Sequence, residues 1–145
     1  MRAKEYLKQI RSIALTVKRI QGDLEKLKAD AESVSINLDG MPKATGNNDR
    51  LVRLAIKMSE YNTMLQEELN VLLDERIKAD KIIKTLPPKQ QTVLIEYYFH
   101  VKKWEQIAEE MDISVRHCHR IHGNALVSFE EGLRNGRGLE TNKRN

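Results

Sequence analysis

The first 34 residues carry a repeat that limits the folds open to this chain. Apolar residues recur there in steps that alternate between three and four, without a miss. Such a heptad pattern predicts an α-helix that packs along its whole length against another helix. The positions are Ala3, Tyr6, Ile10, Ile13, Val17, Ile20, Leu24, Leu27, Ala31 and Val34.

A loop is predicted over residues 36–49, where glycine, proline, asparagine and aspartate gather. Asn48 or Asp49 can cap the helix that follows, which is expected to begin near Leu51. The apolar stripe of this second helix shifts by one residue at Glu68, a stutter that locally unwinds a supercoil. The two helices are therefore predicted to form a long antiparallel hairpin, a coiled coil. The second stripe consists of Leu51, Leu54, Met58, Tyr61, Leu65, Leu69, Leu72, Leu73, Ile77 and Ile83.

The composition agrees with an all-α protein. Charged residues make up 32% of the chain, aromatic residues only 5%, and the formal net charge is +4. This mild basic excess permits an anionic partner without requiring one. A single cysteine cannot form an internal disulfide. The charged N-terminal segment is neither a signal peptide nor a membrane span, so the protein is expected in the cytoplasm, with no membrane partner.

Shorter helices are predicted after the second long helix, which should end at Leu86 because Pro87 and Pro88 follow. Asp112 lies in the turn between the last two helices and can adopt the positive φ that such a turn often requires. Ser114 is a natural N-cap for the final helix. The predicted ranges of these helices are 88–99, 102–111 and 115–132.

The segment LPPKQQTVLIEYYFHVKKWEQIAEEMDISVRHCHRIHGNALVSFE resembles the promoter-reading fourth region of bacterial sigma factors. The likeness covers about a third of the chain. With its long helical N-terminal half, the whole chain resembles small regulators encoded by phages and mobile elements of Gram-positive bacteria, including late-gene activators. The Gly-Met-Pro-Lys segment at 40–43 is a weaker part of that likeness. The shared positions are Leu86, Pro87, Val93, Leu94, Tyr97, Tyr98, Phe99, Gln106, Ile107, Ala108, Ile113, Ser114, Ile121, Ala125, Leu126 and Phe129.

The resemblance implies a helix-turn-helix whose second helix enters the DNA major groove. This chain departs from the family at Val115 and Arg116, where an Arg-Glu pair is usual, at Arg120, where glutamine is common, and at Gly123. It is therefore not expected to read the ordinary promoter element. The expected DNA-binding residues on the second helix and at its cap are Ser114, Val115, Arg116, His117, His119, Arg120 and Asn124.

The residue types support the same reading. No acidic residue occurs from Ser114 to Phe129, and a phosphate-lined groove disfavours acids while arginine pairs with guanine. Lys102 and Lys103 open the preceding helix and can reach the phosphate backbone.

Other uses of the RHCHRIH segment at 116–122 carry less support. Cys118, His119 and His122 are spaced so that they can share a helical face, but a structural zinc site normally needs four ligands. Cys118 is more simply a small core residue. Neither a catalytic site nor a cofactor is expected, because no nucleophile-and-base pair or phosphate loop is evident. Trp104 can stack on a base but is expected to pack over the core.

The sequence thus predicts a helical hairpin at 1–86 for oligomerisation or partner binding, a helix-turn-helix domain at 87–133 and a disordered tail at 134–145. The predicted function is sequence-specific binding of double-stranded DNA to regulate transcription, as a homodimer joined through the N-terminal helices. A monomer is an open alternative. So are a coiled-coil scaffold, or a sigma-like factor that contacts RNA polymerase rather than DNA.

Overall fold

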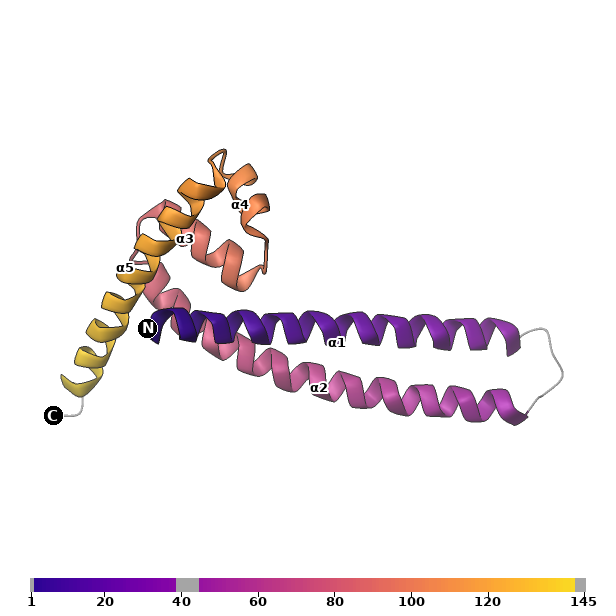
Figure 1. Cartoon of the computed structure of the whole chain (residues 1–145). Coiled ribbons are helices and arrows are strands. Elements are labelled where there is room, and N and C mark those ends of the chain that lie inside the picture. The colour runs from indigo at the N-terminus through magenta and orange to yellow at the C-terminus, as the bar shows by residue number, and fades with distance from the viewer. Residues whose placement is uncertain (1, 39–44, 143–145) are drawn as a thin grey trace. The chain divides into compact units, whose positions relative to one another are not determined.

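A computed structural model describes residues 2–38 and 45–142, and within them the chain is all-α. Figure 1 shows the two long helices at the start of the chain, the short helices that follow and the long final helix. In chain order the elements are α1 (Arg2–Leu38), α2 (Thr45–Ile83), α3 (Pro88–Leu94), the π-helical turn η1 (Ile95–Phe99), α4 (Trp104–Glu110) and α5 (Val115–Asn142). None of the helices in this described part is long and apolar enough to cross a membrane.

The described chain divides into two compact units. One, here called the hairpin unit, is Thr16–Val71, where α1 and α2 run antiparallel and both line one surface hollow. The other, the helix-turn-helix unit, combines Met1–Leu15 with Leu72–Asn145. The first turns of α1 therefore belong to the same unit as the short helices at the far end of the sequence.

The heptad stripe of α1 is confirmed, because each of its ten positions is buried or half-buried. In the hairpin unit, Val17, Ile20, Leu24 and Val34 are buried. The positions of the α2 stripe from Leu51 to Leu72 are likewise buried or half-buried. Glu68 and Leu69 are both half-buried, at the point where the stutter was predicted.

The stripe prediction is wrong for two residues near the end of α2. Leu73 is 51% exposed and Ile77 is 57% exposed. The buried positions are instead Leu72, Ala79 and Ile83. Once the stutter has moved the buried face onto Leu72, steps of seven and four carry it through these residues and leave Leu73 and Ile77 outside.

The predicted loop over residues 36–49 is too long. Helix α1 continues to Leu38 and α2 begins at Thr45, so Asn48 and Asp49 lie inside a helix and neither is its N-cap. No proline occurs from Thr45 to Asp49, and a single glycine there costs only about 1 kcal/mol relative to alanine. The Gly-Met-Pro-Lys segment at 40–43 lies outside the described residues.

The prediction that the last helix ends near Gly132 is also wrong, because α5 continues to Asn142. Gly132 instead lies in close contact with Ile82. A β-carbon there would lie 2.5 Å from Cγ2 of Ile82 on α2. Glycine is thus required by packing between two helices of the helix-turn-helix unit rather than by a helix end.

Candidate nucleic-acid interface

The turn between α4 and α5 has the geometry that the sequence predicted. Asp112 adopts a φ of 56°, a left-handed conformation that aspartate tolerates better than most residues. Its backbone N–H donates to the Glu109 carbonyl, and the N–H of Ile113 donates to the Ala108 carbonyl. The Ser114 hydroxyl accepts a 3.0 Å hydrogen bond from the His117 backbone N–H, which caps α5 as expected.

The two helices of the motif enclose a small apolar core. Ile107 and Ala108 of α4 pack with Cys118 and Ile121 of α5, and Val93 of α3 completes the cluster. Cys118 is fully buried, and burial raises the pKa of its thiol. Its interpretation as a core residue is therefore confirmed. Because these side chains fix one face of α5 inward, the opposite face is left for other contacts.

The outward face of α5 is basic at its N-terminal end. Arg116, Arg120 and Asn124 are exposed, and Val115 is at the edge of exposure. The start of a helix also carries a partial positive charge from its backbone dipoles, which adds to the attraction for phosphate. The structure thus places these predicted residues together on an accessible part of α5, in a stretch of that helix that carries no acidic residue.

The histidines of this helix do not share one environment. His117 is half-buried, whereas His119 is exposed with its ring centroid 4.7 Å from that of Trp104. His122 is half-buried and lies 2.7 Å from the Tyr98 hydroxyl through Nε2. Burial lowers the pKa of His122 to about 4, and the charges of Lys4 and His119 act in the same direction.

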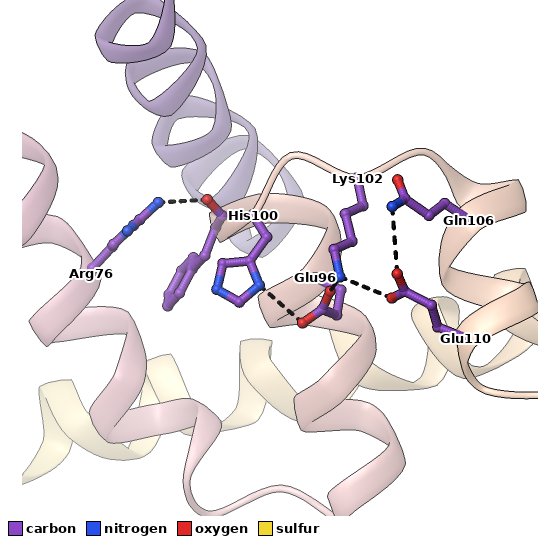
Figure 2. A network of polar contacts seen from close by, with 7 residues as sticks. Arg76, Glu96, His100, Lys102, Gln106 and Glu110 are labelled. Atoms are coloured by element: carbon purple, nitrogen blue, oxygen red, sulfur yellow. Dashed lines mark hydrogen bonds and ion pairs between the residues drawn. The ribbon is translucent and has the colours of Figure 1, made fainter. Parts of the chain in front are cut away.

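The two lysines before α4 also differ. Figure 2 shows Lys102 inside a polar network with Glu96 and Glu110. Its ammonium is 2.9 Å from the Glu110 carboxylate and pairs with Glu96 as well. Both partners raise the pKa of Lys102. Lys103 is exposed and precedes the first residue of α4. Of the two predicted phosphate contacts, Lys103 therefore has the freer charge.

Glu96 is the centre of this network. Burial alone would raise its pKa, but hydrogen bonds from Lys102 and His100 outweigh burial and hold the pKa below its usual value. The His100 Nδ1 atom lies 2.9 Å from the Glu96 carboxylate. Val101 lies between His100 and Lys102 in the sequence and adopts a φ of 59°. A β-branched residue is strained in that conformation, so the contacts that His100 and Lys102 make with Glu96 help to hold the connection before α4.

Sequence reasoning did not find this network or the role of α1. Arg11 on α1 donates a 3.2 Å hydrogen bond from Nε to the Tyr97 carbonyl, and its guanidinium lies 4.4 Å from the Tyr97 ring centroid. The Trp104 ring also stacks on the Tyr97 ring, with the ring centroids 4.0 Å apart. Trp104 also lies against the core cluster, as predicted.

Comparison with protein families assigns the class of this site. Residues 76–122 match the family model described as Sigma-70, region 4. The match runs from the end of α2 through the first turns of α5 and covers about a third of the chain. This segment is therefore a sigma-70 region 4 helix-turn-helix, a class of domain that binds DNA and regulates transcription. Neither curated proteins nor solved structures give a significant match to the chain.

The side chains on α5 that could have bound a metal ion make other contacts. Cys118 points into the core, while His119 and His122 contact Trp104 and Tyr98. In the part of the chain that the structure describes, no group of three or more histidine, cysteine or acidic side chains is arranged to hold a metal ion.

Proposed function

We propose that this protein is a sequence-specific, double-stranded DNA-binding regulator of transcription, encoded by a phage or mobile element. The observation that carries the proposal is the exposed face at the start of α5. It presents Arg116 and Arg120 without a nearby acidic residue on the same helix, in a segment that matches sigma-70 region 4. Arginine at such a position can pair with guanine O6 and N7. The protein then acts by binding rather than by catalysis, in the bacterial cytoplasm where the DNA is.

The residues proposed to contact DNA are of two kinds. Those proposed to face the bases lie on α5, whereas Lys103 at the start of α4 is proposed to contact a phosphate. Lys102 remains a weaker member of the second kind because Glu96 and Glu110 already balance its charge. The first kind comprises Val115, Arg116, His117, His119, Arg120 and Asn124, with Ser114 capping the helix.

Binding to selected duplexes tests this function. Fragments bound from random duplex DNA are sequenced, and the preferred duplex is compared with a scrambled one. Arg120→Ala should weaken specific binding by roughly one to two decades and relax the preference at one base pair. Arg134→Ala is the matched control, because Arg134 is an exposed arginine farther along the same helix, three and four residues after Glu131 and Glu130. Equal affinity of the unaltered protein for both duplexes would refute the proposal. The alternative, that this region contacts RNA polymerase, would then replace it.

We further propose a homodimer joined through the hairpin unit. The α1 stripe cannot supply the interface while the hairpin is intact, because Val17, Ile20 and Leu24 are already buried within one chain. Val52 and Ile56 of α2 are large, apolar and exposed, so they offer a surface that a second copy can cover. Ile56→Asp should yield a monomer with unchanged helicity. A monomer of the unaltered protein in light scattering at micromolar concentration would refute this part.

A further inference from the structure

Four side chains from four elements form a continuous stack in the helix-turn-helix unit. Arg11 of α1 lies over the Tyr97 ring of η1. The Tyr97 ring stacks on Trp104 of α4, with an angle of 15° between the ring planes. Trp104 in turn contacts the His119 ring of α5, at a centroid distance of 4.7 Å and an angle of 48°. The stack begins at a cation fixed by a backbone carbonyl and ends at an exposed imidazole.

The inner part of the stack is rigid for identifiable reasons. Arg11 is fixed at both its Nε atom and its guanidinium face by one residue, Tyr97. The Tyr97 ring also meets the edge of Tyr98, with centroids 4.8 Å apart, and Tyr98 is buried. Trp104 is half-buried and packs against the Ile107 and Cys118 cluster. Only the last member, His119, is exposed among the four.

His119 and His122 lie three residues apart on α5, yet Trp104 contacts them differently. The His122 ring is 4.7 Å from Trp104 at an angle of 64°, and its Nε2 atom is engaged by the Tyr98 hydroxyl. His122 thus belongs to the interior. His119 has its ring against Trp104 and remains open to solvent. An imidazole in this position keeps a hydrogen-bond donor and an acceptor for an external group.

We propose that Trp104 is a positioning residue for base recognition, which holds the His119 imidazole in the orientation used to contact DNA. Tyr97 stacks on Trp104 and is itself held by Arg11, so both residues help to fix the Trp104 ring. An exposed histidine without such a neighbour would lose rotamer freedom when it bound a base edge, and a contact already present in the free protein reduces that entropic cost. This inference rests on the proposed DNA-binding function and assigns a role to a residue outside α5.

A double-mutant cycle tests it. Affinities for the selected and scrambled duplexes are measured for the unaltered protein, Trp104→Leu, His119→Ala and the double variant. Each single change should lower the ratio of the two affinities roughly threefold to tenfold, the range for one hydrogen bond. In the His119→Ala background, Trp104→Leu should change the ratio less than twofold, because Trp104 acts through the imidazole. Additive effects, or no effect of His119→Ala, overturn the proposal.

Two further measurements keep the test decisive. If Trp104→Leu does not fold, Trp104→Met replaces it in the cycle, while Trp104→Phe, which keeps an aromatic ring against His119, should retain most of the preference. In NMR spectra of the free protein, the His119 ring protons should show a ring-current shift that Trp104→Leu abolishes. Ring protons of His119 at random-coil positions in the free, unaltered protein would overturn the proposal.

Two other variants distinguish a failure of the positioning role from a failure of the proposed function. Tyr98→Phe removes the hydroxyl that meets His122 but leaves the stack untouched, so it should not alter the affinity ratio. Arg120→Ala tests DNA recognition independently of the stack. If Arg120→Ala lowers the ratio and the Trp104 variants do not, the positioning role fails and the function stands. If the unaltered protein shows no preference, both fail.

Discussion

Gly132 on α5 lies so close to Ile82 on α2 that a β-carbon on the glycine would stand 2.5 Å from the Ile82 Cγ2 atom. Gly132→Ala therefore forces a branched side chain or a helix to move. We expect the free energy of unfolding to fall by about 1–3 kcal/mol, as for other overpacked contacts. Urea unfolding followed by circular dichroism measures the change.

Gly123→Ala provides the matched control for that variant. Gly123 lies on the same helix, and a β-carbon there meets nothing within 4 Å. Alanine should then stabilise the helix by up to about 1 kcal/mol through its propensity alone. If both substitutions stabilise the protein equally, the contact between Gly132 and Ile82 does not limit the packing of these helices.

A second prediction concerns the first turns of α1. Leu7 is fully buried in the helix-turn-helix unit, whereas Leu15 on the same helix is 42% exposed. Leu7→Ala should lower the free energy of unfolding by about 2–5 kcal/mol because it leaves a cavity in a packed core. Leu15→Ala should cost under about 1 kcal/mol. Equal, small effects would mean that the start of α1 is not part of this core.

Local spacing was enough to predict much of the motif. Asp112, Ser114 and Cys118 each have a role set by neighbours within a few residues, in a turn, a cap and a helix face. The uninterrupted steps of three and four likewise predicted the buried stripe of α1. Such features follow from backbone geometry and periodicity, which a single sequence displays directly.

Features that depend on distant segments were not predictable. Arg11 meets Tyr97 from a separation of 86 residues, and nothing in the pattern of either segment indicates the other. The sequence predicts that the last helix ends near residue 132, whereas Gly132 lies inside α5 and its constraint comes from Ile82, a residue of α2 that the local pattern does not indicate. Lys102 was expected to be free for phosphate, yet the turn before α4 brings it to Glu96 and Glu110.

A third prediction follows from His122. Its pKa in the folded protein is lowered to about 4, whereas an unfolded histidine titrates near 6.5. Between these values the unfolded chain binds a proton that the folded chain does not. The free energy of unfolding should therefore fall as the pH is lowered from about 6.5 towards 4. Chemical unfolding at a series of pH values measures this slope.

His122→Gln is the control for the pH effect, because glutamine can still accept a hydrogen bond from the Tyr98 hydroxyl but does not titrate. This variant should lose much of the slope above pH 5. Glu96 affects the free energy of unfolding in a lower pH range. Because its pKa is lowered, the stability that it contributes is lost only as the pH falls below the ordinary carboxylate range. An unchanged slope in His122→Gln would assign the pH effect to other groups.

A fourth prediction distinguishes the two lysines before α4 through the salt dependence of DNA binding. Each phosphate neutralised by a protein cation releases counterions, so removing one contact flattens the slope of log affinity against log salt by about one unit. Lys103→Ala should show this loss on selected and scrambled duplexes alike, because its charge is exposed. Lys102→Ala should flatten the slope much less, since two carboxylates already balance that ammonium. Removing Lys102 should instead destabilise the connection around Val101, where Glu96 would lose a partner. The same full loss of slope in both variants would show that the ion pairs of Lys102 open when DNA binds.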